Sequence, residues 1–247
     1  MVDSEAVLNE FFSSDAYLND PELGYTGYLA PSSESCRRIQ ARKLLRVMRD
    51  VCGIDARTLE IGCGTAALVR TLRDQGHECD GIDLSSTMAR AARNLNSVDI
   101  LCGDFMSTEY KPGSYRRICM FGVIGTVRSV KDTLVKVHNV LEPLGWLVMN
   151  YMDFDHWTRN VLGKHYHRQS ISSRFCLNRG TVERYLDSAG FELVREISDW
   201  KWTTLGSLPG FLRSHALKRA VEWFHLDWVP LLVPVPGGRL IFARKRS

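Results

Sequence analysis

The sequence predicts an α/β fold built on a doubly wound, mostly parallel sheet of seven strands with lid insertions. Two observations lead to this prediction. Short apolar strands and amphipathic helices alternate from Arg57 to Met149, which is typical of a parallel sheet with helices on both faces. A glycine-containing turn joins the first strand to its helix, and acidic residues follow the next strands, as in ligand crevices at the carboxyl edge of such sheets.

Length and composition fit one domain with insertions. The chain has 247 residues, of which 45% are hydrophobic, so it can bury most of the surface that its unfolded form exposes. We expect residues 1–34 to form an N-terminal lid segment and residues 35–247 to form the main domain. Within that domain, the stretches 151–175 and 200–236 exceed what simple connections need, so we expect them to cover the substrate.

The cysteines and the start of the chain bear on location. Seven cysteines without a Cys-x-x-Cys pair indicate small buried side chains in a reducing compartment. The N-terminus lacks a basic segment followed by an apolar one, and no apolar stretch reaches the roughly 18 residues that suggest a membrane span. We therefore expect a cytoplasmic protein without a transmembrane segment.

Residues 1–34 place five aromatic side chains among Gly, Pro and Ser, so we expect little regular structure there beyond a short helix. Such a segment either packs on the core as a cover or closes over a ligand. The stretch Ser35 to Val51 then has apolar residues near helical spacing and basic residues outside that stripe, which predicts an amphipathic helix.

The first strand of the predicted sheet, Arg57 to Ile61, leads into a tight turn that contains Gly62, Cys63 and Gly64. Glycine allows a turn at positions where a Cβ atom would collide with a bound ligand. Good helix formers and an apolar stripe follow in Ala66 to Leu72, so the turn opens directly into a helix.

The second strand, Glu78 to Ile82, is followed at once by Asp83. A carboxylate at the carboxyl end of a parallel strand can accept hydrogen bonds from both ribose hydroxyl groups of a nucleoside. The turn and this acid together predict a nucleoside-binding crevice.

The stretch Glu60 to Thr65 reads Glu-x-Gly-x-Gly-Thr, and with Asp83 it resembles class I S-adenosylmethionine (SAM)-dependent methyltransferases. The first motif of that family has the form Glu-x-Gly-x-Gly-(Thr/Ser)-Gly, and here Ala66 replaces the final glycine, a departure that a small side chain should tolerate. The resemblance spans roughly residues 35–245. It implies a Rossmann-like sheet, methyltransferase activity and SAM as the cofactor.

The resemblance continues along the chain. Gly103-Asp104-Phe105 follows a third strand, Val98 to Cys102, as in the family motif whose acid contacts the adenine amino group and whose next residue stacks on the ring. Arg117 to Phe121 is similar to the fourth strand, Leu141 to Met149 to the helix end, turn and fifth strand, and Ala189 to Val194 to the sixth strand and its helix.

In this family an aromatic hydroxyl of the N-terminal segment commonly meets the methionine carboxylate of the cofactor, which makes its three tyrosines candidates. The full set of residues that we expect to bind the cofactor is Tyr17, Tyr25, Tyr28, Glu60, Gly62, Cys63, Gly64, Asp83, Leu84, Met88, Gly103, Asp104, Phe105 and Phe121.

A histidine-rich stretch after the fifth strand offers candidates for catalysis. SAM is already activated, so alignment matters most, and a general base helps if the acceptor is a hydroxyl group. His156 is the first candidate base, with Asp153 or Asp155 orienting its imidazole; His165 and His167 are the alternatives. The three histidines can equally be surface residues of a polar connection.

A metal site is not expected. His165 and His167 face the same side only in an extended strand, and no third ligand lies at a motif-like distance. Metal-dependent catechol methyltransferases place an acid just after the fourth strand, where this chain has the stretch Gly122 to Gly125.

The second insertion, residues 200–236, holds four of the six tryptophans and a helical pattern from Leu208 to Phe224. The apolar side of that helix can cap the core, line an apolar pocket, or rest on a membrane surface with Arg213, Lys218 and Arg219 facing phosphates. The last two arrangements indicate a lipophilic acceptor and leave peripheral membrane contact open.

We therefore expect a SAM-dependent methyltransferase that acts on a small, aromatic or apolar molecule, on oxygen more readily than on nitrogen or carbon. Secondary-metabolite, quinone and lipid biosynthesis are the candidate settings. A net charge of +4 without a basic and aromatic stripe argues against nucleic acid. Two alternatives remain: a catalytically silent SAM-binding module, and an NAD-dependent oxidoreductase, against which Ala67 stands at the position of the third glycine. The sequence leaves the oligomeric state open.

Overall fold

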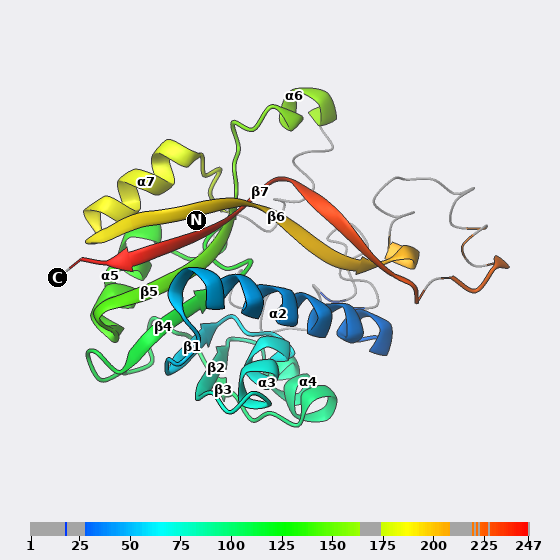
Figure 1. Cartoon of the computed structure of the whole chain (residues 1–247), viewed down its shortest axis with the longest axis horizontal. Coiled ribbons are helices and arrows are strands. Elements are labelled where there is room, and N and C mark those ends of the chain that lie inside the picture. Colours follow the sequence, from blue (N-terminus) through cyan, green and yellow to red (C-terminus); the bar gives the residue numbers. More distant parts are fainter. Residues whose placement is uncertain are drawn as a thin grey trace, which may run out of the picture.

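The computed structural model describes residues 18, 28–163, 174–207, 219, 221, 223–226 and 228–246. In this part of the chain seven strands form one sheet, with helices against it (Figure 1). The strands are β1 (Thr58–Ile61), β2 (Cys79–Asp83), β3 (Leu101–Cys102), β4 (Tyr115–Met120), β5 (Leu141–Met152), β6 (Phe191–Thr204) and β7 (Pro230–Lys245). The helices are α2 (Pro31–Cys52), α3 (Ala67–Arg73), α4 (Ser86–Asn96), α5 (Val130–Val140), α6 (Thr158–Leu162) and α7 (Arg179–Ser188), with a 3₁₀ turn η4 (Leu205–Ser207).

The strand order is β3-β2-β1-β4-β5-β7-β6. The first five strands of this order run parallel, and β7 lies antiparallel between β5 and β6. The prediction of an α/β fold with a mostly parallel, seven-stranded sheet is therefore confirmed. The parallel strands β1, β2, β4 and β5 end at one edge of the sheet, which we call the carboxyl rim, and ligands of such folds bind outside this edge.

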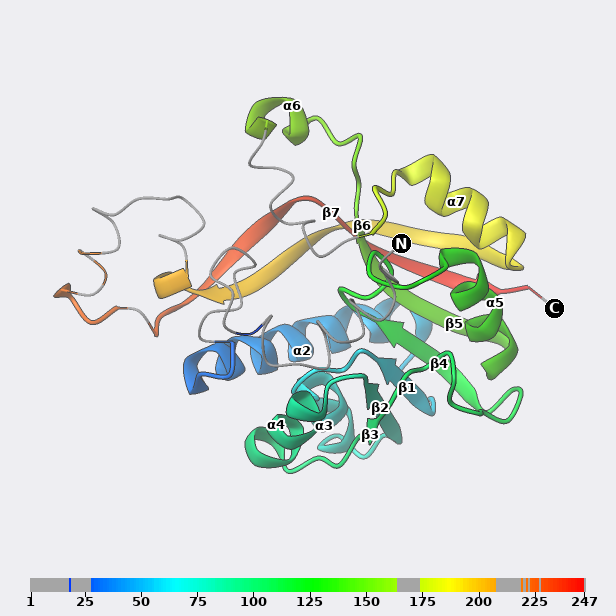
Figure 2. The ribbon, with the colours of Figure 1, turned by 180° about the vertical axis from the view of Figure 1, so that it is seen from behind.

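Successive residues of the strands point alternately into two apolar clusters, one on each face. In β4, Ile118 and Met120 pack with α5 and α7, whereas Cys119 between them packs with α2, α3 and α4. Figure 2 shows α5 and α7 together on the viewer's side of the sheet, with α2 behind it. This alternation follows from the pleat of a strand. Because both faces are covered, the central strands are almost continuously apolar.

Polar side chains begin three of the helices. Ser85, Ser129 and Asn178 each accept a hydrogen bond from the backbone N–H three residues later, at 3.2, 3.2 and 2.9 Å. These caps satisfy N–H groups that have no partner inside the helix. Helix α3 begins differently, after Ala66, whose φ of 60° is left-handed. The glycine turn therefore fixes the start of α3 through its backbone path.

Several element boundaries differ from those expected. Helix α2 begins at Pro31, a residue type that suits the first turn of a helix because its missing N–H is not needed there. Residues 31–34 therefore belong to the helix, so the expected division between residues 34 and 35 falls inside its first turn. The third strand is only Leu101–Cys102, shorter than the expected Val98 to Cys102, and it pairs with β2 through just those two residues.

The second insertion differs most from the expectation. Strand β6 continues to Thr204 and β7 starts at Pro230, and the two pair from Trp200↔Pro234 to Thr204↔Pro230. We call this extension the β6–β7 arm; it projects beyond the sheet in Figure 1. Most of the helical run expected from Leu208 to Phe224 lies outside the described residues.

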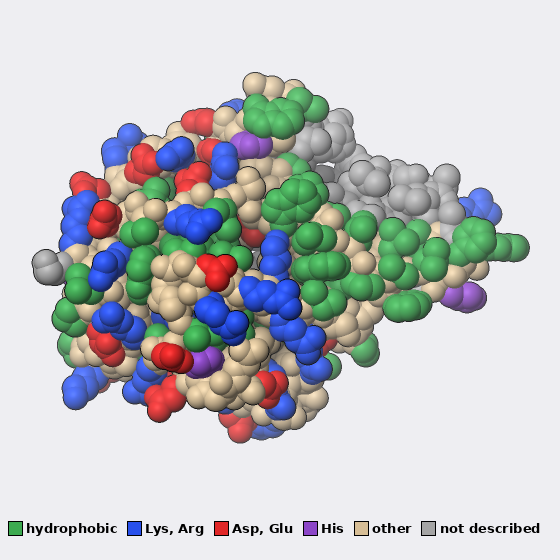
Figure 3. Space-filling model, in the orientation of Figure 1, with side chains coloured by type: hydrophobic (Ala, Val, Ile, Leu, Met, Phe, Trp, Pro, Cys, Tyr) green, Lys and Arg blue, Asp and Glu red, His purple; other side chains and the backbone are tan. Residues whose placement is uncertain are grey.

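Apolar side chains are exposed along the β6–β7 arm and in the stretch of chain between its two strands (Figure 3). Trp223 is 80% exposed and Trp228 is 62% exposed, and Trp200, Leu231 and Leu232 are also exposed. No helix in the described part of the chain is both long and apolar enough to cross a membrane.

Two neighbouring residues of α5 test the assignment of its buried face. Leu134 is fully buried, whereas Val135 is 40% exposed. We expect Leu134→Ala to lower the free energy of unfolding by about 2–5 kcal/mol, because it removes core contacts and leaves a cavity. Val135→Ala should change it by no more than about 0.5 kcal/mol. Urea denaturation of both variants measures the difference, and equal losses would contradict the assignment.

Candidate functional site

The turn after β1 has a backbone conformation and close neighbours that only glycine tolerates at two positions. Gly62 has a φ of 67° and Gly64 a φ of 53°, both in the left-handed region that favours glycine. A Cβ added to Gly62 would lie 2.4 Å from Cγ2 of Val123, and one added to Gly64 would lie 3.2 Å from the hydroxyl oxygen of Tyr28. This turn, residues 62–66, is called the glycine loop below. The loop after β4 and the N-terminal segment therefore both reach it.

Asp83, the last residue of β2, holds the glycine loop in place. Its Oδ2 accepts a hydrogen bond from the backbone N–H of Gly64 at 2.8 Å, and its Oδ1 accepts one from Ser85 at 2.9 Å. Burial raises the pKa of Asp83, and the two backbone hydrogen bonds oppose that shift. Because each carboxylate oxygen has a second lone pair, Asp83 can still accept hydrogen bonds from a ligand. The expected ribose contact fits this geometry.

Glu60 lies one residue before the end of β1 and is buried. Burial and, to a smaller extent, the nearby negative charge of Asp83 raise its pKa to about 8, against a backbone hydrogen bond from Val69. Its Oε2 has no hydrogen-bond partner among the residues that the structure describes. A buried polar atom without a partner is costly and uncommon in proteins. Next to the glycine loop, such an atom is available to a ligand, which agrees with the expected cofactor contact of Glu60.

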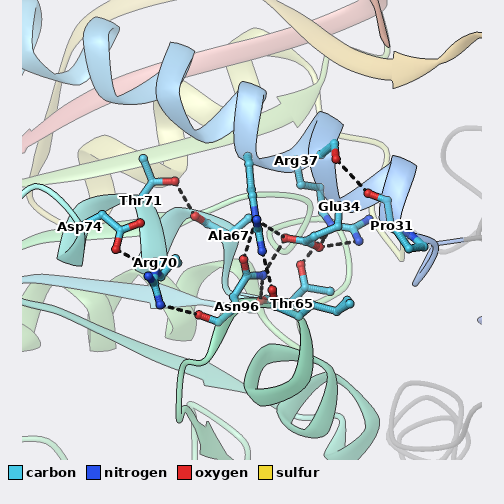
Figure 4. Close-up of polar contacts among 12 residues, drawn as sticks. Pro31, Glu34, Arg37, Thr65, Ala67, Arg70, Thr71, Asp74 and Asn96 are labelled. Carbon is cyan, nitrogen blue, oxygen red and sulfur yellow. Dashed lines mark hydrogen bonds and ion pairs between the residues drawn. The ribbon is translucent and has the colours of Figure 1, made fainter. Parts of the chain in front are cut away.

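A buried polar network fixes the other side of the glycine loop (Figure 4). The amide nitrogen of Asn96 donates to Oε1 of Glu34 at 2.6 Å and to the carbonyl of Thr65 at 2.7 Å. Nε of Arg37 donates to Oε2 of Glu34 at 2.9 Å and to Oγ1 of Thr65 at 3.0 Å. Three elements, α2, the glycine loop and α4, therefore meet at one buried carboxylate.

Tyr28 is the one of the three candidate tyrosines that the structure describes; Tyr17 and Tyr25 lie outside the described residues. Its carbonyl accepts a hydrogen bond from Arg37 at 2.7 Å, and the Arg37 guanidinium lies 4.2 Å from the centre of its ring. Arg37 thus holds Tyr28 beside Gly64. The expected contact between Tyr28 and a ligand in the glycine loop is consistent with this position.

The residues expected at the adenine end take different positions. Asp104 is exposed, and its Oδ1 accepts a hydrogen bond from the backbone N–H of Met106 at 3.0 Å. Phe105 is buried in the core cluster, 5.4 Å from the ring of Tyr110 and 5.1 Å from Nζ of Lys136. The ring of Phe105 is therefore packed in the core in this arrangement, and its stacking on a ligand stays a prediction.

Four further residues of the expected cofactor set lie around the same rim. Met88 and Cys63 are buried, and the sulfur of Met88 would lie 3.9 Å from a Cβ on Gly64. Leu84 and Gly103 follow the ends of β2 and β3 and are partly exposed. Their placement along one edge agrees with a ligand that extends from the glycine loop toward β3.

The next wall of the site comes from β4 and β5. Phe121 follows β4, is partly exposed and packs against the cluster on the α2 face. The backbone N–H of Gly122 donates to Oδ1 of Asn150 at 2.7 Å. Since Val123 reaches Gly62, the loop after β4 joins the glycine loop to the end of β5.

The structure describes contacts of His156 and of the two acids that were expected to orient it. Nδ1 of His156 lies 2.8 Å from Oγ1 of Thr158, whereas Asp155 accepts a hydrogen bond from Asn178 at 2.7 Å. Asp153 is buried, and its Oδ2 lies 3.9 Å from Nε of Arg239. The orienting role expected of Asp153 or Asp155 stays a prediction.

The other two histidine candidates, His165 and His167, lie outside the described residues. Within the described ranges, no group of three or more His, Cys, Asp or Glu side chains is arranged to hold a metal ion.

Some residues of this site have no local sequence signal. Glu34, Arg37 and Asn96 come from two helices and act on the glycine loop from 28 to 31 residues away. Asn150 and Asp199 form a second such pair, with the amide of Asn150 donating to Oδ2 of Asp199 at 2.9 Å. The only hint of that pair in the sequence is the run Pro236 to Gly238, which interrupts an otherwise apolar strand.

Comparisons with known proteins agree with this geometry. Residues 33–196 match the family of methyltransferase domains. No sequence relative is found among curated proteins.

Three solved structures show the same fold. A protein from Thermotoga maritima, described as a SAM-dependent methyltransferase and possible histamine N-methyltransferase, is 19% identical, with a TM-score of 0.56 over 90% of this chain and 95% of that chain. A putative methyltransferase from Bacillus halodurans is 14% identical, with a TM-score of 0.62 over 83% and 100%. A putative sarcosine dimethylglycine methyltransferase from Galdieria sulphuraria is 17% identical, with a TM-score of 0.57 over 85% of both chains.

The role of Asp83 can be measured directly. We expect Asp83→Ala to weaken binding of S-adenosylhomocysteine by about 1.5–3 kcal/mol, or roughly ten- to a hundredfold, since a charged acceptor is lost. Asp74→Ala is the matched control, because Asp74 pairs with Arg70 on the surface of α3. Calorimetric titration of the folded variants measures both, and unchanged affinity in Asp83→Ala would remove this residue from the ribose site.

Glu60 predicts a pH dependence of stability. Its pKa is 4.5 when unperturbed and about 8 in the folded protein, so between these values only the folded state keeps the proton. The free energy of unfolding of the cofactor-free protein should therefore fall as pH rises from about 5 to about 8. Glu60→Gln removes this contribution. Urea denaturation at several pH values should show the variant gaining stability over wild type toward pH 8; a difference that does not change with pH would refute the assignment.

Proposed function

The chain belongs to the family of methyltransferase domains and is a class I SAM-dependent methyltransferase, and on this premise we propose that it methylates a hydroxyl group of a small aromatic or apolar molecule. The observation that carries the cofactor part is the glycine loop with its two acids, Asp83 and Glu60. The acceptor part rests on the apolar β6–β7 arm and on the electrostatics of the carboxyl rim.

The residues present suit the cofactor. Glu60 offers a buried oxygen that has no partner in the described part of the chain, and the glycine loop leaves the space that a Cβ at Gly62 or Gly64 would fill. SAM supplies a methyl group on a positively charged sulfur, and when an acceptor lone pair bonds to that carbon, the carbon–sulfur bond breaks and its electron pair stays on sulfur. The protein's own contribution is to bind, to align and to keep water out.

Within this proposal, different residues of the carboxyl rim bind different parts of the cofactor. Asp83 accepts the ribose hydroxyl groups, Glu60 and Tyr28 lie at the glycine loop for the methionine end, and Asp104 lies at the adenine end. The remaining proposed contacts are Gly62, Cys63, Gly64, Leu84, Met88, Gly103 and Phe121, together with Tyr17 and Tyr25.

The arm supports an apolar acceptor. Two hydrogen bonds fasten it to α2: Nζ of Lys43 donates to the carbonyl of Trp200 at 3.1 Å, and the backbone N–H of Trp202 donates to Oε1 of Gln40 at 3.2 Å. The arm therefore brings indole rings alongside the helix whose first turn carries Glu34. Aromatic side chains beside a cofactor site are typical walls of a pocket for flat, apolar molecules.

Location and proton transfer complete the proposal. All seven cysteines are free thiols, which supports a reducing, cytoplasmic setting. His156 remains a candidate base through Nε2, since Nδ1 faces Thr158, and His165 and His167 remain alternatives. Residues 1–34 remain a proposed lid, of which Tyr28 is the described contact.

SAM with a labelled methyl group tests the function, because the label marks whichever molecule accepts it. Protein incubated with a cell extract and labelled SAM should yield a small molecule heavier by one methyl group, detected by mass spectrometry, and mild base should not remove the label as it would from an ester. Calorimetry should show binding of S-adenosylhomocysteine and none of NAD. Label on an amine nitrogen, the acceptor type named for the Thermotoga maritima protein, would replace the hydroxyl proposal; label on nucleic acid would overturn the small-molecule proposal.

A further inference from the structure

The Asn150–Asp199 pair sits where the carboxyl rim meets the β6–β7 arm. Val148, two residues before Asn150, and Ile197, two before Asp199, both pack with the cluster on the α2 face, so both polar side chains share that face. The glycine loop opens into α3, which covers the same face. Asn150, Asp199 and the glycine loop therefore lie on one side of the sheet.

The orientation of the Asn150 amide is fixed by its partners. Its Oδ1 faces the backbone N–H of Gly122 at 2.7 Å, a group that can only donate. Its nitrogen must then face Oδ2 of Asp199, at 2.9 Å. Asn150 thus links the loop after β4, which touches Gly62 through Val123, to the carboxylate of Asp199.

A break in strand pairing places Asp199 at this point. Ser198 pairs with Arg239 and Trp200 pairs with Pro234, so Asp199 alone stands opposite residues 235–238 of β7. A Cβ added to Gly238 would lie 3.1 Å from Cβ of Asp199, which shows how closely the chain passes there. Bulges of this kind redirect a side chain and are frequent beside active sites.

The charges around Asp199 limit what it can bind. Burial lowers the pKa of Lys43, and the charge of Asp199 opposes that shift. Burial also lowers the pKa of Lys201, the positive charge of Arg37 lowers it further, and Asp199 opposes it. Nζ of Lys43 donates to the carbonyl of Trp200, the residue after Asp199, at 3.1 Å, and Lys201 follows in the same strand. One carboxylate therefore stands near two cationic side chains, and this surplus of positive charge disfavours an ammonium ligand.

Asp199 keeps capacity for a ligand. It is partly exposed, and within the described ranges Asn150 is the one hydrogen-bond donor to its carboxylate, at Oδ2. Its Oδ1 can accept a further hydrogen bond.

We propose that Asp199 binds the hydroxyl group of the methyl acceptor through Oδ1, with Asn150 as the positioning residue, and that this acceptor is neutral or anionic and not an ammonium ion. The inference rests on the proposed function and names the group that the acceptor presents. It also explains why a carboxylate is held at the junction of three elements, where a purely structural contact would not need a charge.

A pair of probes with the same ring system tests this assignment. 2-Naphthol presents a neutral hydroxyl group, and 2-naphthylmethylamine presents an ammonium ion at pH 7. Calorimetric titration of the full chain saturated with S-adenosylhomocysteine should show 2-naphthol binding at least tenfold more tightly than the ammonium probe. Asp199→Asn should weaken 2-naphthol binding at least tenfold, because the charged acceptor is lost, and leave the affinity for S-adenosylhomocysteine unchanged within about twofold.

Asn150→Ala and Asp187→Asn complete the design. Asn150→Ala keeps the carboxylate of Asp199 but removes the amide that positions it, so this variant should weaken 2-naphthol binding less than Asp199→Asn does. If Asp199→Asn does not fold, Asn150→Ala alone tests the assignment. Asp187 pairs with Arg246 at 2.6 Å on the surface near α7, and Asp187→Asn should change nothing.

Three results would overturn the inference: tighter binding of the ammonium probe, no binding of 2-naphthol, or equal binding of 2-naphthol by wild type and Asp199→Asn. Loss of binding in His156→Ala instead would move the acceptor site to the stretch after β5. Absence of any methylated small molecule in the labelling experiment refutes the proposed function, so the two failures are distinguishable.

Discussion

The geometry of the cofactor site depends on the buried carboxylate of Glu34. This side chain is only 3% exposed, and it receives hydrogen bonds from Asn96 and Arg37 on different helices. Burying a carboxylate is costly unless partners satisfy it, and removing one partner from such a group is far more destabilising than the contact itself suggests. Because both partners also bind Thr65, the requirement to satisfy Glu34 fixes the position of the glycine loop. The loop is therefore held at Thr65 by Arg37 of α2 and at Gly64 by the carboxylate of Asp83.

The two ends of the site obey different constraints. Around the glycine loop, the carboxylates of Asp83 and Glu34 are already paired, and Oε2 of Glu60 is the atom that lacks a partner among the described residues, so a ligand enters a nearly complete arrangement. At the end of β5, Asn150 and Asp199 lie at an open, partly exposed junction between strands. This division suits a fold that binds one common cofactor and a particular acceptor. The glycine loop can stay unchanged while the residues at the end of β5 change with the acceptor.

The sequence predicted those features whose residues lie close together along the chain, and missed those whose residues lie far apart. Glu60, the glycine loop and Asp83 lie within 24 residues and follow from strand, turn and strand-end rules, so the sequence predicted them. Asn150 and Asp199 meet across 49 residues through a pairing break that no periodic pattern announces. The β6–β7 arm was missed because proline argues against a strand, yet β7 contains Pro230, Pro234 and Pro236. The pairing of β7 with β5 stops at Gly238. From Pro230 to Gly237, the side of β7 that does not face β6 therefore has no described partner strand. Every second residue on that side needs no backbone N–H, so proline is tolerated there. The contacts of Asp153 with Arg239 and of Asp155 with Asn178 were not predicted for a similar reason, since these partners lie far along the chain.

The way the arm is fastened to α2 has a consequence for divergence between related proteins. Lys43 and Gln40 hold the carbonyl of Trp200 and the N–H of Trp202, which are backbone groups that nearly every amino acid provides. The attachment therefore places no demand on the side chains at positions 200 and 202. Natural selection can exchange those indoles for other shapes while the strand keeps its course along the helix, so the repertoire of accepted molecules can drift without any loss of cofactor affinity.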